Sequence, residues 1–186
     1  MARTASNMLP LGTTAPDFKL PDTVSDKILS LDELKSDKAT VIMFICNHCP
    51  FVKHVDEIIV ALAKHYQTKG VSFIAINSND AENYPQDSPR LMKVEAEKVG
   101  YTFPYLFDET QEVAKAYQAA CTPDFYVFDA ELKCVYRGQL DDSRPGNGQP
   151  VTGKDLRSAL DCVLNNEKID FEQRPSLGCN IKWKVG

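Results

Sequence analysis

Apolar residues form two long runs in the first half of the chain. Residues 40–45 are rich in β-branched side chains, and residues 71–77 form a second such run. Runs of this kind are typical of strands that are buried on both faces of a sheet. Between them, apolar residues recur at helical spacing over residues 51–63, after Pro50 and before Gly70. This pattern predicts one amphipathic helix of about five turns between two central strands.

The rest of the chain predicts shorter elements. Strands are expected at residues 15–22, 27–31, 103–107, 124–129 and 133–137, and helices at 91–99, 111–120 and around 156–164. The short connection between the last two strands is of hairpin length. Strands that alternate with helices in this way predict an α/β fold, in which helices cover both faces of a central sheet.

The length of the chain, 186 residues, suits a single domain. We expect one domain over residues 1–186, with residues 1–14 and 168–186 as terminal extensions. No run approaches the ~18 apolar residues of a membrane-spanning helix, and no signal sequence is visible, so a cytoplasmic location is expected. The net charge of −5 and the lack of a basic block disfavour nucleic-acid binding.

Six cysteines are the unusual feature of the composition. A chain of this size builds its own core, so redox, catalytic, metal-binding or packing roles suit them better than a disulfide framework. Cys46 and Cys49 lie three positions apart, between a buried strand and the helix that begins at Pro50. A helix N-terminus stabilises a thiolate, and two thiols at this spacing can form a disulfide. The arrangement predicts a redox pair, with Cys46 as the exposed nucleophile and Cys49 as the more buried resolving thiol.

Residues near this pair in sequence or in the expected fold support the assignment. His48 would place a cation beside Cys46 and lower the pKa of its thiol. Pro123 precedes a predicted strand, where a cis Thr122–Pro123 bond is compatible with a tight turn. Cys121 would then lie within reach of the site, either as a third redox or metal-binding thiol or as a buried packing residue.

The remaining cysteines fall into two groups. Cys134 lies in a predicted strand and Cys162 beside the apolar side of the last helix, so both are expected to be packing residues. Cys179 lies in the tail beyond that helix, near the only tryptophan, Trp183. A tail of this kind can fold back over a site, so a resolving or ligand role for Cys179 competes with simple structural docking.

The chain resembles the thioredoxin-fold superfamily, in the branch that groups alkyl hydroperoxide reductase, thiol-specific antioxidant and TlpA/ResA-like proteins. The resemblance spans residues 15–167 and rests on the motifs Ala15-Pro16-Asp17-Phe18, Cys46-Asn47-His48-Cys49-Pro50 and Thr122-Pro123-Asp124. It implies a thioredoxin-like fold, with a central mixed β-sheet flanked by helices, an N-terminal hairpin and an inserted helix and strand. It also implies that Cys46 and Cys49 are the redox pair, that Pro123 is a cis-proline facing them, and that Thr122 offers backbone bonds to a substrate strand.

Two departures from the resembled proteins affect the expected chemistry. Residues 40–45 contain no acidic residue, whereas thioredoxins carry a buried carboxylate there as a proton acceptor. His48 or a water molecule is therefore the expected acceptor. Peroxidases of this branch carry a threonine three residues before the reactive cysteine, whereas this chain has Met43 before Cys46. Peroxidase activity is therefore less favoured than disulfide exchange.

The sequence predicts a thiol–disulfide oxidoreductase with a role in antioxidant defence and redox homeostasis. Its expected substrate is a protein or low-molecular-weight thiol or disulfide, and no cofactor, resident metal, nucleic acid or membrane is expected. The protein would be a monomer or a weak dimer. The alternatives are a thiol peroxidase and a thiolate metal-binding or metal-delivery protein that uses Cys46 and Cys49 with Cys121 or Cys179, since thiolates suit Cu(I) or zinc.

Overall fold

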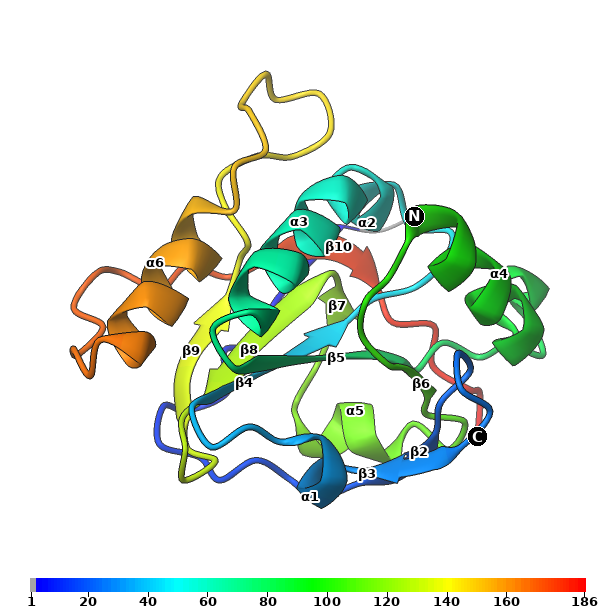
Figure 1. Ribbon diagram of the computed structural model, residues 1–186. Helices are drawn as coiled ribbons and strands as arrows, with labels where there is room; N and C mark the ends of the chain where they lie inside the picture. Colours follow the sequence, from blue (N-terminus) through cyan, green and yellow to red (C-terminus); the bar gives the residue numbers. More distant parts are fainter. Residues whose placement is uncertain (1–2) are drawn as a thin grey trace.

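Figure 1 shows the computed structural model of the protein, which describes residues 3–186. Its centre is a five-stranded sheet with the strand order β6-β5-β4-β8-β9. The strands are β4 (Ala39–Phe44), β5 (Val71–Asn77), β6 (Tyr105–Phe107), β8 (Asp124–Phe128) and β9 (Cys134–Gly138). Strands β4, β5 and β6 run parallel, whereas β8 pairs antiparallel with both β4 and β9. The predicted α/β fold with a mixed central sheet is confirmed.

Helices cover both faces of this sheet (Figure 1). One face carries α2 (Pro50–Lys53), α3 (Asp56–Gln67), α4 (Pro89–Val99) and α6 (Lys154–Leu164). The other carries α1 (Leu31–Leu34), α5 (Glu112–Ala116) and the hairpin of β2 (Lys19–Pro21) and β3 (Ile28–Ser30). In β4, Val41 and Met43 pack toward the first face, and Ile42 and Phe44 toward the second. Burial on both faces explains why this strand is apolar throughout.

The single five-turn helix expected after Pro50 is two helices, α2 and α3. The interruption lies at Val55, whose backbone N–H donates to Val52 O, three residues back. Val55 has a φ of −115°, outside the helical range, and α3 begins after it. Val52 and Ile59 are both buried in the same core, so the apolar spacing continues across the break. The spacing of the apolar residues therefore predicts which face is buried, but it does not predict whether the helical hydrogen bonds continue without a break.

Backbone conformation also sets the ends of two other helices. Helix α4 ends at Gly100, whose φ of 85° suits the predicted stop, because glycine adopts this left-handed conformation without strain. Helix α5 is shorter than the predicted 111–120. Gln111 before it and Gln118 after it both have left-handed backbones, with φ of 65° and 55°. These two residues confine the helix to one short segment.

The two ends of the chain meet in a second sheet beside the main one. It contains β1 (Arg3–Ala5), β7 (Cys121–Thr122) and β10 (Leu177–Asn180), with β10 in the centre. The sequence did not predict these strands. Both terminal extensions, 1–14 and 168–186, therefore contribute strands to the domain within its described residues (Figure 1).

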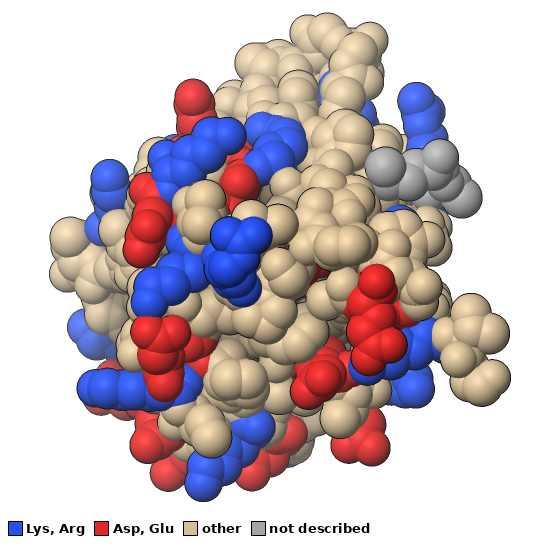
Figure 2. Space-filling view, turned by 90° about the vertical axis from the view of Figure 1, so that its right-hand side faces the viewer, with Lys and Arg blue, Asp and Glu red and all other residues tan. Residues whose placement is uncertain are grey.

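Charged side chains are dispersed over the surface in view in Figure 2. On this face Lys and Arg alternate with Asp and Glu, and they form no continuous basic area there. Among the described helices, none combines the length and the apolar character that crossing a membrane requires.

Candidate redox site

Cys46 lies directly after β4, at the carboxyl end of the central parallel strands. Ile45 still pairs with β5, since its N–H donates to Ile76 O at 3.0 Å, and the chain then turns toward α2. Pro50 is the first residue of that helix, as predicted. Carboxyl ends of strands are where α/β sheets gather reactive groups. The motif therefore lies where the sequence predicted it, between a buried strand and a helix. The side chain of Cys46, however, is only 2% exposed, so it is not the exposed nucleophile that was expected.

Cys49 forms a disulfide with Cys179 of β10, across 130 residues of sequence. Cys46 is therefore a free thiol in this structure, and the predicted Cys46–Cys49 disulfide is not the one present. Both bonded cysteines are buried. The tail does fold back over the site and brings Cys179 to Cys49, whereas a redox role for Cys179 and the pairing of Cys46 with Cys49 stay predictions.

Thr122 contacts both halves of the sequence motif. Its hydroxyl Oγ1 lies 3.4 Å from Cys46 Sγ, and its carbonyl oxygen lies 3.3 Å from Cys49 Sγ. The peptide bond between Thr122 and Pro123 is cis, as expected for this position. Thr122 thus touches the free thiol through its side chain and the disulfide through its backbone.

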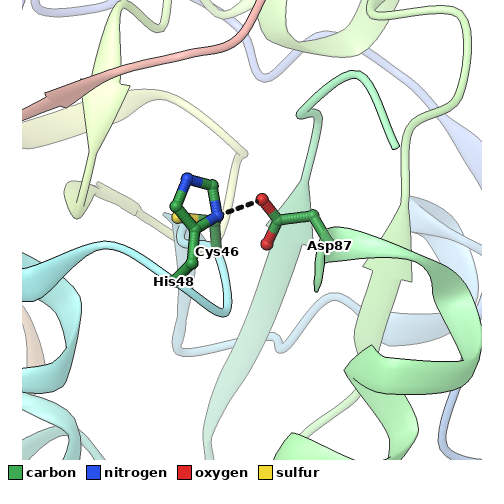
Figure 3. A group of neighbouring side chains, drawn as sticks. All are labelled: Cys46, His48 and Asp87. Atoms are coloured by element: carbon green, nitrogen blue, oxygen red, sulfur yellow. Dashed lines mark ion pairs between the residues drawn. The ribbon is translucent and has the colours of Figure 1, made fainter. Parts of the chain in front are cut away.

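Asp87 supplies a buried carboxylate beside the free thiol (Figure 3). His48 Nδ1 lies 2.5 Å from Asp87 Oδ2, and one ligand atom each of Cys46, His48 and Asp87 lies within 4.8 Å of the others. The other Asp87 oxygen accepts a 2.7 Å hydrogen bond from the backbone N–H of Asn47. The imidazole of His48 stacks on the ring of Tyr84, with an interplanar angle of 4°. The loop before α4 therefore fixes both the orientation of His48 and the start of the CxxC segment.

The carboxylate missing from β4 is thus provided by a residue that sequence reasoning did not single out. Asp87 is completely buried, in a short 3₁₀ helix (Pro85–Asp87), within the acidic loop between β5 and α4. The side-chain amides of Asn77 and Asn79 also donate to it, at 3.3 and 2.9 Å. The one sequence signal was that this loop follows the carboxyl end of a buried strand, so that its residues could line the cleft.

The electrostatics of the site differ from the expectation for Cys46. Burial first, and then the negative charge of Asp87, raise the pKa of the Cys46 thiol to about 11. The hydroxyl of Thr122 and the backbone amides of Cys49 and His48 act in the opposite direction, but they do not outweigh burial. The lowered pKa that was predicted for this thiol is not found in the present disulfide state, because burial, followed by the charge of Asp87, outweighs the groups that favour the thiolate. Cys46 is held here as a protonated thiol.

Replacing Asp87 with asparagine should lower the pKa of Cys46, because it removes a negative charge beside the sulfur. Burial remains in the variant, so the pKa should fall without reaching that of a free cysteine. The pH dependence of iodoacetamide labelling at Cys46, followed by peptide mass spectrometry on the oxidised protein, measures it. We expect faster labelling at every pH below the pKa, by tenfold for each unit by which the pKa of Cys46 falls. The exposed Asp37→Asn variant is the control, and slower labelling in Asp87→Asn would contradict this account.

The other predicted candidate, Cys121, is a buried free thiol. Its sulfur contacts the carbonyl oxygen of Pro123 at 3.9 Å, and burial together with the charge of Asp124 raises the pKa of its thiol. In the pairing of β7 with β10 it stands opposite Asn180, the residue after Cys179. Its role, as a third redox or metal-binding thiol or as a packing residue, stays a prediction.

The donor set also bears on metal binding. Cys49 and Cys179 are joined in the disulfide, so the thiolates of the metal hypothesis are not assembled in this state. Cys46, His48 and Asp87 are close enough to hold an ion. Both oxygens of Asp87, however, already accept hydrogen bonds from the surrounding amides. The carboxylate is satisfied by protein donors, so its burial needs no metal to explain it.

Comparison with known proteins agrees with this fold. A family model described as "AhpC/TSA family" matches residues 11–137. An uncharacterized conserved protein from Geobacillus kaustophilus is 63% identical over 100% of this chain and 98% of its own, with a TM-score of 0.99. A hypothetical protein from Sinorhizobium meliloti 1021 is 49% identical over 98% and 100%, with a TM-score of 0.96. No curated protein matches the sequence.

A more distant structure shares the fold. A putative thiol:disulfide interchange protein DsbE from Chlorobium tepidum is 18% identical, covers 84% of this chain and 99% of its own, and has a TM-score of 0.66. At this level of identity the likeness concerns the fold alone. The similarity extends over most of both chains, so the fold is shared as a whole and not only around the cysteines.

Proposed function

Because the chain belongs to the AhpC/TSA family, whose thioredoxin-like members carry thiol redox activity, we propose that it is a thiol–disulfide oxidoreductase that needs no cofactor. The observation that carries this proposal is the free Cys46 thiol held beside a Cys49–Cys179 disulfide at the cis Thr122–Pro123 bond. Thiol, disulfide and a shared contact residue together are the components of exchange chemistry.

The proposed reaction begins with the fully reduced protein. The Cys46 thiolate attacks one sulfur of a substrate disulfide, which forms a mixed disulfide and releases the first substrate thiol. The Cys49 thiolate then attacks Cys46 Sγ and releases the second. Two electrons pass to the substrate, and one disulfide remains on the protein. The amides of His48 and Cys49 stabilise the developing thiolate at Cys46 in either direction.

Low-molecular-weight disulfides fit the site better than protein substrates. All three sulfurs of the centre are buried, with Cys46 at 2% exposure. The edge of β7 beside the cis-proline is occupied by β10, so an extended protein strand would have to displace it. A cytoplasmic role in thiol homeostasis, as a monomer or weak dimer, completes the proposal.

A thiol peroxidase is the second candidate, since the branch that the sequence resembles includes peroxidases. One feature of the sequence opposes it here: Met43 occupies the position of the expected threonine.

A single-turnover experiment tests the proposal. Reduced protein, freed of reductant, is mixed with hydroxyethyl disulfide or with hydrogen peroxide, and the loss of free Cys46 and Cys49 is followed by alkylation and mass spectrometry. We expect the disulfide to oxidise these cysteines much faster than it oxidises free cysteine, while the peroxide shows no such preference. Selective oxidation by peroxide instead would identify a peroxidase, and no selective oxidation by either would refute a redox enzyme.

A further inference from the structure

The tail strand β10 is built against the redox centre and is not loosely attached to it. It pairs antiparallel with β7, and its Cys179 stands opposite Thr122. The approach is so close that a Cβ on Gly178 would collide with the carbonyl oxygen of Thr122. Only glycine therefore allows the two strands to lie at this spacing.

Hydrogen bonds hold β10 at both ends, independently of the disulfide. Before the strand, Ser176 Oγ donates to Pro123 O at 2.5 Å. After it, Ile181 N donates to Ala120 O at 3.0 Å. Lys182 N then donates to Asn79 Oδ1 at 2.8 Å. Cys179 is thus kept at the site by the strand itself, whether or not its sulfur is bonded.

Thr122 contacts or pairs with all three cysteines of the site, including Cys46 and Cys179, each of which could form a disulfide with Cys49. Its hydroxyl contacts the Cys46 sulfur, its carbonyl contacts the Cys49 sulfur, and its residue is the strand partner of Cys179. The three cysteines are also members of one buried cluster. Cys49 lies three residues after Cys46 in the sequence and is bonded to Cys179. Its sulfur is therefore the one with which both Cys46 and Cys179 could form a disulfide.

We propose that Cys49 is the common partner of two alternative disulfides, and that the Cys46 thiol exchanges into the Cys49–Cys179 bond to give Cys46–Cys49 and a free Cys179. The Cys46 thiolate attacks Cys49 Sγ, a Cys46–Cys49 bond forms and the Cys49–Cys179 bond breaks. The proton lost by Cys46 is balanced by the proton gained at Cys179. The oxidation state of the protein does not change, so no external oxidant is needed.

By this exchange the enzyme would keep its disulfide at Cys49–Cys179 between turnovers. The inference rests on the function proposed above. The same exchange runs in reverse after turnover: the Cys179 thiolate attacks Cys49 Sγ, the Cys46–Cys49 bond breaks, and Cys46 takes up a proton and returns to a buried thiol. Because the ends of β10 stay bonded, Cys179 serves as a third redox thiol supplied by the tail. The substrates that fit such a closed centre are small thiols and disulfides.

Disulfide mapping of the oxidised protein tests the exchange. The protein is moved from mildly acidic to mildly alkaline pH, quenched at intervals in acidic denaturant and labelled with N-ethylmaleimide, and the labelled peptides are identified. We expect one label per molecule in the three-cysteine centre, with the share at Cys179 rising with time and the share at Cys46 falling. Cys46→Ser should lose the Cys179 label, and Cys162→Ser should behave as wild type.

The outcomes separate this inference from the proposed function. In Gly178→Ala the added Cβ would collide with the carbonyl oxygen of Thr122 and push β10 away from β7. This variant should therefore raise the share of label at Cys179. Label confined to Cys46 at every time, in wild type and in Gly178→Ala, would overturn the exchange. In that case single-turnover oxidation by hydroxyethyl disulfide that still needs Cys46 would leave the oxidoreductase standing. Oxidation of Cys49 at the wild-type rate in Cys46→Ser would instead refute the oxidoreductase mechanism.

Discussion

Replacing Cys46 with serine should abolish the reaction of the reduced protein with small disulfides. The variant keeps the Cys49–Cys179 pair but lacks the thiol that contacts Thr122 and the amides at the start of α2. A serine hydroxyl is not a nucleophile for a disulfide sulfur, so the rate should fall by on the order of a thousandfold or more, as when other enzymes lose their nucleophile. The burst of released thiol after mixing with hydroxyethyl disulfide measures it.

Two further cysteine variants sharpen this prediction. Cys162→Ser changes a free cysteine outside the centre and should leave the rate unaltered. Cys49→Ser removes the resolving thiol and should accumulate a mixed disulfide at Cys46, visible as an added mass on that peptide. A normal burst in Cys46→Ser would mean that Cys49 or Cys179 is the attacking thiol and that the roles assigned here are wrong.

The parts of the site that could be predicted from the sequence are those with strong local signals. The continuous apolar run of β4, followed by two cysteines and Pro50, places the reactive segment at the carboxyl end of a central strand. Such a run, rich in β-branched residues, is typical of a strand that is buried on both faces. The cis Thr122–Pro123 bond was likewise indicated by a proline at the entry to a strand.

The parts that could not be predicted depend on contacts across the whole chain. Strand β10 has four residues, Leu177–Asn180, two of which are glycine and asparagine, so it carries no local strand signal. Its pairing with β7 and β1 joins segments from both termini. The role of Asp87 could not be predicted for a similar reason. Only the fold shows that this one acidic residue of a polar loop turns inward and pairs with His48.

Because neither β10 nor Asp87 was predicted, Cys46 was expected to be exposed and to have a lowered pKa, and both expectations differ from the structure. The local sequence places a histidine and a helix N-terminus next to the thiol, and both favour a thiolate. The structure adds Asp87 and a covering strand, which remove water and introduce a negative charge. Desolvation is the larger of these effects, so the environment set by distant residues outweighs the one set by near neighbours.

Reducing the Cys49–Cys179 disulfide should lower the free energy of unfolding by as much as about 5 kcal/mol, which is the chain-entropy value for a closed loop of 130 residues. Cys179→Ala provides the matched comparison, because the only disulfide left to its centre is Cys46–Cys49. That bond closes a loop of a few residues, for which the same relation gives about 2 kcal/mol or less. Urea unfolding of both proteins, oxidised and reduced, measures the two differences. A loss on reduction that is no larger in wild type than in Cys179→Ala would show that the disulfide in solution does not join the tail to α2.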